Sequence, residues 1–275
     1  MPRIPHRIRR HIRTVVLLEN WLEFLRADLT RGDLASVRTR RGIVLEARRG
    51  ANLKYLFLEI WLSRVYTPPG YEIHAGDVVM DIGANIGVFS TFAASTAPRT
   101  RVFAYEPFSE SAACLRSNVR ASGLHNVAVF EQAVCSGRGR RVLSIESGNW
   151  VMHTLAGNGA APAAGARGGF PERTVEVDCV GLDDVFRDNG IVRCNLLKVD
   201  CEGSEYEIFE ASSQDTMDRI DRIVIEYHEG PKFAGTGAQL RDVLIDRGFA
   251  VDHFVPGGEG TGYICARSKR LRKAP

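Results

Sequence analysis

Hydrophobic and polar residues alternate with two different periods along most of this chain. Short apolar runs with the length of a strand lie at residues 78–82, 101–105, 127–132, 194–200, 222–227, 249–254 and 262–266. Apolar positions at helical spacing lie between most of them, at residues 88–97, 110–122, 204–211 and 240–247. Strands that alternate with helices predict a mostly parallel sheet with helices on both faces, and the last two strands predict an antiparallel pair at its edge. The expected fold is therefore α/β and Rossmann-like, with a seven-stranded sheet.

The chain before residue 71 follows a different pattern. Apolar residues from Ile12 to Leu29 recur at helical spacing between charges, which predicts one amphipathic helix. A strand at residues 43–47 and a short helix at residues 56–60 are expected before a Pro-Pro-Gly turn. We therefore expect a basic and amphipathic N-terminal extension (1–70), a main domain (71–266) and a basic tail (267–275).

Two further strands are expected at residues 140–145 and 174–180, with a glycine- and alanine-rich segment between them at residues 156–169. This segment has too few large apolar side chains to pack into a core. It is either a mobile lid over a substrate or a surface excursion without a role, and the sequence leaves both readings open.

The amino-acid composition is typical of a globular protein, and the charge is unevenly distributed along the chain. The chain has 275 residues, of which 44% are hydrophobic and 25% charged, as in an ordinary globular protein. The formal net charge of +3 is too small to favour nucleic acid as a partner. Arginine and lysine nevertheless gather at both ends of the chain, at Arg3, Arg7, Arg9, Arg10, Arg13, Arg267, Lys269, Arg270, Arg272 and Lys273. These ends either contact an anionic membrane surface or phosphate-bearing partner, or are simply solvated.

The cysteines and the apolar runs bear on the compartment. Six cysteines are scattered without a Cys-x-x-Cys pair, which argues against a zinc site. Several fall inside apolar strand patterns, where a free thiol behaves as a small hydrophobic residue, so a reduced cytoplasmic protein is expected. The sequence contains no secretory signal pattern and no apolar run long enough to cross a bilayer. The oligomeric state does not follow from these features.

A glycine-spaced turn follows the strand at residues 78–82. Asp81 ends the apolar run, and Gly83 and Gly87 allow a tight turn with a close approach of the backbone to a ligand. Asn85 stands where the dinucleotide fingerprint has its middle glycine, so a pyrophosphate is a poor match. An acidic strand end suits a cationic ligand such as the ammonium group of S-adenosylmethionine. The alternative is a glycine-rich turn in some other α/β sheet.

The next two strands complete this expected cofactor site. Glu106 follows the strand at residues 101–105, where an acid commonly holds both ribose hydroxyls of a nucleoside. Ala133 follows the strand at residues 127–132, where an adenine ring would lie. The predicted cofactor contacts are Asp81, Gly83, Asn85, Gly87, Glu106 and Ala133.

A second group of ionisable residues follows the fourth and fifth parallel strands. Asp200, Glu202 and Glu205 follow one strand, and Glu226 and His228 end the other, so all five are expected at the same crevice. Removal of a hydroxyl proton needs a general base, and His228 is the preferred one, with Asp200 and Glu202 as further catalytic candidates. Glu202, Glu205, Glu226 and His228 could alternatively bind Mg²⁺, but no ligand spacing demands it and no metal is assigned.

Five motifs together resemble the FkbM-type methyltransferases over residues 66–263: Asp81–Gly87, Tyr105–Pro107, Leu182–Asp184, Leu197–Glu205 and Ile225–His228. The resemblance implies a class I methyltransferase fold that uses S-adenosyl-L-methionine to methylate a hydroxyl of a sugar, polyketide or similar molecule. The expected activity is O-methylation of a glycan or secondary metabolite. Two alternatives stay open, an RNA or protein methyltransferase and a nucleotide-binding interaction module without catalysis.

Overall fold

The computed structural model describes residues 6–48, 50–145, 153–155, 173–230, 233, 235–258 and 260–273. Its main element is a seven-stranded sheet of β3 (Val78–Ile82), β4 (Arg101–Tyr105), β5 (Val127–Phe130), β10 (Leu196–Val199), β11 (Arg222–His228), β12 (Phe249–Pro256) and β13 (Thr261–Ser268). The strand order is β12-β13-β11-β10-β3-β4-β5, and β13 runs antiparallel to both of its neighbours. The remaining pairs are parallel, so the predicted α/β fold with its antiparallel closing pair is confirmed.

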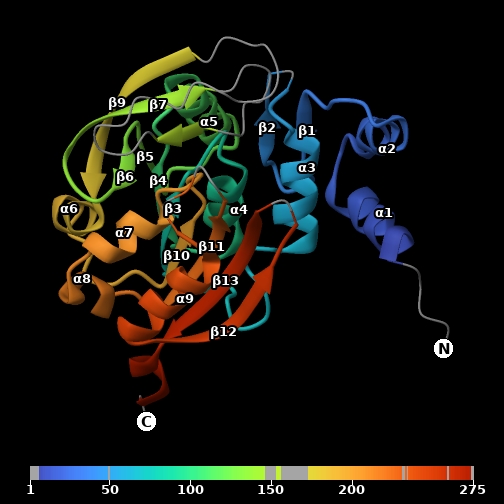
Figure 1. Ribbon diagram of the computed structural model, residues 1–275. Helices are drawn as coiled ribbons and strands as arrows, with labels where there is room; N and C mark the ends of the chain where they lie inside the picture. The colour runs from blue at the N-terminus through green and yellow to red at the C-terminus, as the bar shows by residue number, and fades with distance from the viewer. Residues whose placement is uncertain are drawn as a thin grey trace.

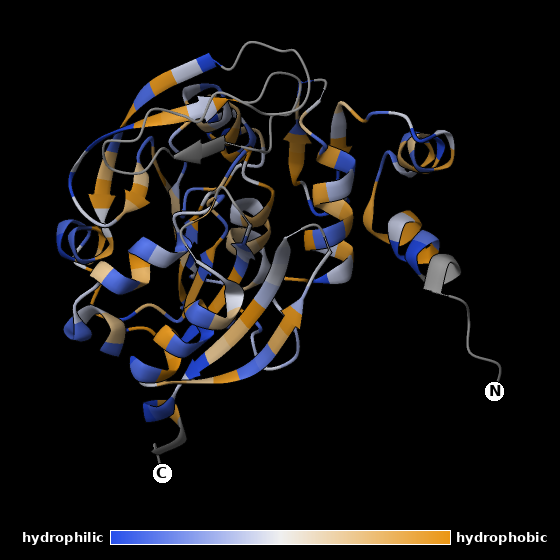
Figure 2. Ribbon diagram, viewed as in Figure 1, coloured by the Kyte–Doolittle hydropathy of each residue, from blue (hydrophilic) through white to orange (hydrophobic). Residues whose placement is uncertain are grey.

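Helices cover both faces of this sheet (Figure 1). One face packs against α3 (Leu53–Phe57), η1 (Leu58–Ser63), α4 (Val88–Thr96) and α5 (Ser109–Ala121). The other packs against α6 (Leu182–Asp188), α7 (Glu205–Ala211), α8 (Gln214–Asp218) and α9 (Gly237–Asp246). Alternate side chains of a strand enter opposite cores, as Val79 and Met80 do, and both sets are apolar because both faces are buried. Figure 2 shows the resulting hydrophobic strands at the centre of the molecule.

The N-terminal residues form two helices where the sequence predicts one. α1 (His6–Leu17) and α2 (Trp21–Thr30) are separated by a turn, in which Leu18 bridges to Thr39 and the Asn20 side chain accepts a hydrogen bond from the Arg38 amide. These long-range contacts outweigh the local helical periodicity. A two-stranded sheet of β1 (Ser36–Arg38) and β2 (Val44–Glu46) follows. Phe24 belongs to the same hydrophobic cluster as strand β3, so the predicted extension shares its core with the main sheet.

A second sheet lies beside the first. The strands predicted at residues 140–145 and 174–180 belong to it, but the sequence did not predict that they form a separate sheet. It contains β6 (Ala133–Cys135), β7 (Gly139–Ile145), β8 (His153–Leu155) and β9 (Arg173–Gly181) in the order β6-β9-β7-β8. The third parallel strand therefore ends at Phe130, and Ala133 begins a new strand instead of ending the old one. The glycine-rich segment at residues 156–169 lies outside the described residues.

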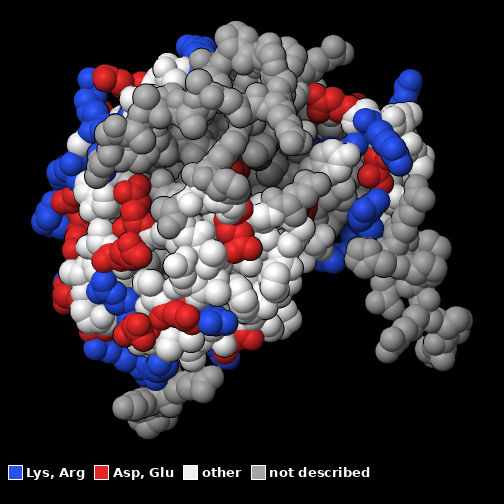
Figure 3. Space-filling model, viewed as in Figure 1, with Lys and Arg blue, Asp and Glu red and all other residues white. Residues whose placement is uncertain are grey.

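Surface charge is mixed. Figure 3 shows basic and acidic side chains interspersed over the visible face. Near the chain ends, Arg10 pairs with Asp28 at 2.8 Å, Arg13 donates to the Leu62 carbonyl at 2.8 Å, and Arg267 donates to Asp252 at 2.9 Å. These three arginines are thus engaged within the protein, and membrane contact through the basic ends stays a prediction. In the described part of the chain, none of the helices has the length and apolar character needed to span a membrane.

Candidate active site

A pocket opens at the carboxyl ends of β3, β4 and β10. Its volume is about 840 Å³ with the open space at its mouth included. Its lining brings together six of the residues singled out from the sequence, namely Gly83, Asn85, Glu106, Ala133, Asp200 and Glu202. The two predicted clusters, cofactor-binding and catalytic, therefore meet at this strand-end pocket.

The glycine turn is built on close backbone packing. Gly83 has a φ of +73°, and a Cβ there would lie 1.7 Å from the carbonyl oxygen of Asp200. Gly87 has a φ of +86°, and a Cβ there would lie 2.2 Å from the Leu115 side chain. A side chain at Gly83 would force the turn away from β10, whereas at Gly87 it would strain the left-handed backbone and displace the end of the Leu115 side chain. Glycine at position 83 is therefore required for the close packing of this part of the pocket lining.

Glu106 and Asn85 form one wall of the pocket. Glu106 is 5% exposed, and its carboxylate accepts hydrogen bonds from the backbone amides of Asn85 at 2.8 Å and Phe108 at 2.9 Å. Burial raises the pKa of Glu106 to about 7, although these two amides lower it. Asn85 adopts a φ of +49°, and its Oδ1 is buried without a hydrogen-bond partner among the described residues. Both side chains thus have hydrogen-bonding capacity left for a ligand.

Asp81 lies behind the pocket rather than in its lining. It is fully buried, accepts a hydrogen bond from Ser90 at 2.5 Å, and lies 3.1 Å from the ammonium nitrogen of Lys198. The two charged residues are register partners on the adjacent parallel strands β3 and β10. Asp81 is therefore already neutralised within the protein, and direct contact with a cofactor ammonium stays a prediction.

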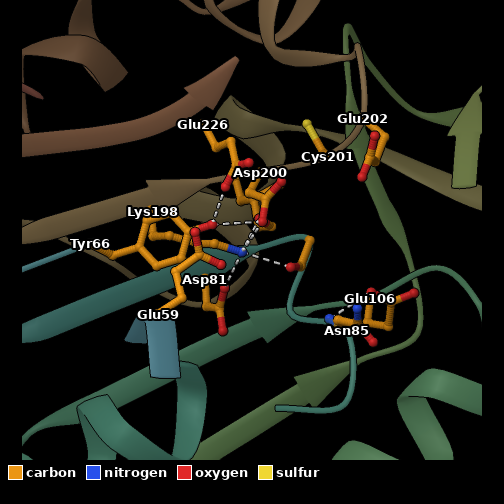
Figure 4. A network of polar contacts seen from close by, with 12 residues as sticks. Glu59, Tyr66, Asp81, Asn85, Glu106, Lys198, Asp200, Cys201, Glu202 and Glu226 are labelled. Atoms are coloured by element: carbon orange, nitrogen blue, oxygen red, sulfur yellow. Dashed lines mark hydrogen bonds and ion pairs between the residues drawn. The ribbon is translucent and has the colours of Figure 1, made fainter. Parts of the chain in front are cut away.

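Lys198 is a central residue of the site that the sequence analysis quoted but did not interpret. Its ammonium group also donates to the carbonyl of Gly83 at 2.7 Å and lies 3.5 Å from Asp200 (Figure 4). Burial by itself lowers the pKa of Lys198, but Asp81 and Asp200 together raise it above its ordinary value. The side chain therefore stays charged and ties the glycine turn to the acidic end of β10. A lysine inside the apolar run Leu196–Val199 was the available signal.

Tyrosines connect Asp200 to further carboxylates. The Tyr66 hydroxyl contacts Asp200 at 2.9 Å and Glu226 at 2.6 Å, and the Tyr263 hydroxyl contacts Glu226 at 2.9 Å and Glu59 at 2.8 Å. Tyr66, Tyr263 and Glu59 belong to no recognisable motif and were missed from the sequence. Glu226 joins this network instead of joining the group around His228.

His228 is held between two carboxylates. Its Nδ1 lies 3.1 Å from the fully buried Glu205, and its Nε2 lies 3.3 Å from Glu202. Burial opposes a charge on the ring, but the hydrogen bond to Glu205 and the nearby Glu202 raise the pKa of His228 to about 9. The ring therefore carries both protons at neutral pH. Glu205 also accepts hydrogen bonds from the amides of Cys201 and Gly203, so the pair fixes the loop after β10.

Three residues of this group could in principle bind a metal ion. Asp200, Glu202 and His228 offer ligand atoms that lie within 4.8 Å of one another. A ligating imidazole needs an unprotonated nitrogen, whereas both nitrogens of His228 face carboxylates. A divalent cation bound at these three residues would therefore have to displace the proton on Nε2 of His228.

Comparison with known proteins assigns the chain to a family. The profile of the methyltransferase FkbM domain matches residues 81–251. The 31-O-demethyl-FK506 methyltransferase FkbM of Streptomyces tacrolimicus is 30% identical over 237 residues, which cover 78% of this chain and 89% of that protein. The chain belongs to the FkbM methyltransferase family. The resemblance drawn from the sequence motifs is thereby confirmed.

The chain is also similar to two further methyltransferases. The hexuronic acid methyltransferase AglP of Haloferax volcanii is 26% identical over 160 residues, which cover 58% of this chain and 59% of that protein. Among solved structures, the magnesium protoporphyrin IX methyltransferase ChlM of Synechocystis PCC 6803 with bound SAM has a TM-score of 0.48 and 10% identity, covering 94% of this chain and 97% of that chain.

The chain is an S-adenosyl-L-methionine-dependent methyltransferase of this family. The strand-end pocket fits that cofactor in two respects. Glu106 is a buried acid with free acceptor capacity, and the Asn85 Oδ1 lacks a hydrogen-bond partner among the described residues. Ribose hydroxyls and amino groups are the donors that such acceptors bind.

Proposed function

We propose that this methyltransferase transfers a methyl group to a hydroxyl of a glycan or a secondary metabolite. Two relatives support this acceptor class, because one is a 31-O-demethyl-FK506 methyltransferase and the other is a hexuronic acid methyltransferase. The observation that carries the proposal is the meeting of Glu106 and Asp200 in a single pocket. This arrangement combines an acceptor for ribose hydroxyls with a carboxylate that can take a proton.

The roles of the side chains follow from their positions. Bound S-adenosyl-L-methionine supplies an activated methyl group on a sulfonium. Glu106 and Asn85 would hold its polar groups, while Gly83 lets the turn pack closely against the end of β10. The protein must then orient the acceptor hydroxyl in line with the methyl group and remove its proton.

We assign the proton acceptor to Asp200. Its side chain lines the pocket, is 26% exposed and lies beside the Lys198 ammonium, which favours a negative charge there. His228 was the preferred base from the sequence, and that role stays a prediction. The contacts of His228 with Glu202 and Glu205 instead favour a positioning role, in which it holds the loop that carries Glu202. Glu202 lines the pocket and remains a further candidate base.

Methyl transfer onto a panel of hydroxyl acceptors tests the function. Uronic acids, other glycosides and polyketide alcohols are incubated with S-adenosyl-L-methionine, and formation of the methyl ether is measured by mass spectrometry. We expect Asp200→Asn to lower the single-turnover rate by about 10²-fold or more, the effect of losing a positioned general base. Methylation at nitrogen or carbon alone would contradict the proposal. A full rate in Asp200→Asn would move the base to Glu202 or His228.

A further inference from the structure

Two tyrosine hydroxyls join three carboxyl groups into one continuous chain of contacts. In order, the chain runs through Asp200, Tyr66, Glu226, Tyr263 and Glu59 (Figure 4 labels all but Tyr263). Its four O···O distances lie between 2.6 and 2.9 Å, which is the range of hydrogen bonds between oxygens. Asp200 lines the pocket, whereas Glu59, at the other end, is half-buried on η1 and does not.

Counting hydrogens shows that this chain must hold extra protons. Each of the four contacts needs one hydrogen, and the two tyrosine hydroxyls supply only two. The other two must come from the three carboxyl groups. One oxygen of Glu226 takes part in both of its contacts, so Glu226 can satisfy at most one of them as a donor. Two of the three carboxyls are therefore protonated and one is ionised when all four contacts are made.

Three arrangements meet this condition, and they differ only in which carboxyl carries the charge. With the charge on Asp200, Tyr66 donates to Asp200, Glu226 donates to Tyr66, Tyr263 donates to Glu226 and Glu59 donates to Tyr263. With the charge on Glu226, both tyrosines donate to it and the two end carboxyls donate to the tyrosines. With the charge on Glu59, donor and acceptor exchange roles in each of the four hydrogen bonds of the first arrangement. The Lys198 ammonium, 3.5 Å from Asp200, favours the first.

The burial of the members agrees with this proton count. Burial raises the pKa of Tyr66, which is 3% exposed, well above its usual value, and burial likewise raises the pKa of Tyr263. Both hydroxyls therefore keep their hydrogens at neutral pH. Burial also raises the pKa of Glu226 to about 7 and that of Glu59 above its ordinary value, so burial acts on both carboxyls in the direction that this proton count requires.

We propose that this chain is a proton relay, which receives the proton of the acceptor hydroxyl at Asp200 and releases a proton from Glu59. The inference rests on the proposed O-methyl transfer. The acceptor O–H bond breaks, its electron pair forms the new bond to the methyl carbon, and the carbon–sulfur bond breaks with its pair on sulfur. The hydroxyl proton goes to Asp200. After Glu59 releases a proton, hydrogens shift along Tyr66, Glu226 and Tyr263, and Asp200 is ionised again.

Infrared spectroscopy tests the proton count without any assumption about activity. Protonated carboxyl groups absorb apart from carboxylates, so spectra of the folded protein at neutral pH can be compared between variants. We expect Glu226→Gln and Glu59→Gln each to remove signal of protonated carboxyl. The control is Glu210→Gln, an exposed residue at the end of α7, which should leave that signal unchanged. Spectra of Glu226→Gln and Glu59→Gln that keep the full signal would overturn the relay.

The pH dependence of the single-turnover rate tests whether the three carboxyl groups share one negative charge. Tyr66→Phe removes a hydrogen-bond donor to the Asp200 carboxylate, so the acidic limb of the pH–rate profile should move to higher pH. Glu226→Gln removes a competitor for the single negative charge, so the limb should move to lower pH. Each shift should be about one pH unit, the equivalent of one hydrogen bond. Tyr55→Phe, at an exposed tyrosine on α3, should shift nothing.

The pH–rate profiles of Tyr66→Phe and Glu226→Gln distinguish a proton relay from a hydrogen-bond network that only stabilises the fold. A structural role would lower the rate uniformly in both variants, and parallel profiles would therefore overturn the relay. Shifts in opposite directions would support it. If the protein methylates no hydroxyl at all, the infrared spectra still decide the proton count, so failure of the proposed function and failure of the relay are distinguishable.

Discussion

Lys198 and Asp81 face each other on neighbouring parallel strands beneath the pocket, with 3.1 Å between the ammonium nitrogen and the carboxylate. The side chain of Lys198 is 3% exposed and that of Asp81 is fully buried. An ion pair this deep needs additional hydrogen bonds to offset its desolvation, and Ser90 and the Gly83 carbonyl provide them. The pair thereby links the core of the fold to the turn that shapes the cofactor pocket.

The first prediction concerns this ion pair. Lys198→Met leaves Asp81 charged and buried without its partner, and we expect a loss of about 3–5 kcal/mol in the free energy of unfolding. Lys198→Met combined with Asp81→Leu should recover part of that loss. Urea denaturation of the single and double variants measures the coupling. Lys269→Met, at an exposed lysine, is the control, and a loss no larger than in this control would contradict the prediction.

The second prediction separates a steric clash from backbone strain at glycine. Gly83→Ala places a Cβ 1.7 Å from the Asp200 carbonyl oxygen, so the backbone must move, and we expect a loss of more than about 3 kcal/mol in stability. Gly123→Ala is the matched control. Gly123 also has a positive φ, +61°, but its Cβ would meet nothing within 4 Å, so only about 1 kcal/mol of strain is expected. Equal losses in thermal or urea denaturation would argue against the close packing.

The sheet and its glycine turn could be predicted because their signals are local. Each parallel strand is a short apolar run, and the turn at Gly83 and Gly87 has fixed spacing. The break between α1 and α2 could not be predicted, because it depends on the pairing of Leu18 with Thr39. The same holds for the strand that begins at Ala133, which pairs with the distant β9.

The site was only partly predictable for the same physical reason. Asp200, Glu202 and Glu106 follow apolar strands, and parallel strand ends meet at one edge of a sheet, so their convergence at the pocket followed from topology. Tyr66 and Glu226 touch although 160 residues separate them, and no local pattern in the sequence encodes such a contact. The contacts of both ring nitrogens of His228 with carboxylates likewise could not be predicted from the sequence.

The third prediction is a pH dependence of stability at His228. Its pKa in the folded protein, about 9, lies above the ordinary value of 6.5. The stabilisation is therefore complete below pH 6.5 and is lost as the pH rises towards 9. His228→Ala should cost about 3–5 kcal/mol at pH 6, since Glu205 is left charged and buried, and less at pH 9. His125→Ala, at an exposed histidine, is the control for urea denaturation at each pH. A loss independent of pH would contradict a charged ring.

The fourth prediction concerns metal dependence. Because both nitrogens of His228 face carboxylates, we expect the methyl-transfer rate to survive dialysis against EDTA. The measurement compares treated enzyme with and without added Mg²⁺. Activity that is lost and then restored by Mg²⁺ would mean that an ion displaces the Nε2 proton of His228, and would make Asp200 and Glu202 metal ligands.

The last prediction concerns cofactor binding and its pH dependence. Glu106 has a pKa of about 7 in the free protein, and a ribose hydroxyl binds better to its ionised form. Affinity for S-adenosyl-L-methionine should therefore rise as the pH increases through 7. Glu106→Gln should weaken binding by about 1.5–3 kcal/mol at pH 8 and remove that pH dependence. Calorimetric titration at pH 6 and pH 8 measures both effects. Glu131→Gln, an exposed acid after β5 that pairs with Arg116, is the control. Unchanged affinity in Glu106→Gln would place the ribose elsewhere and would withdraw the strand-end pocket as the cofactor site.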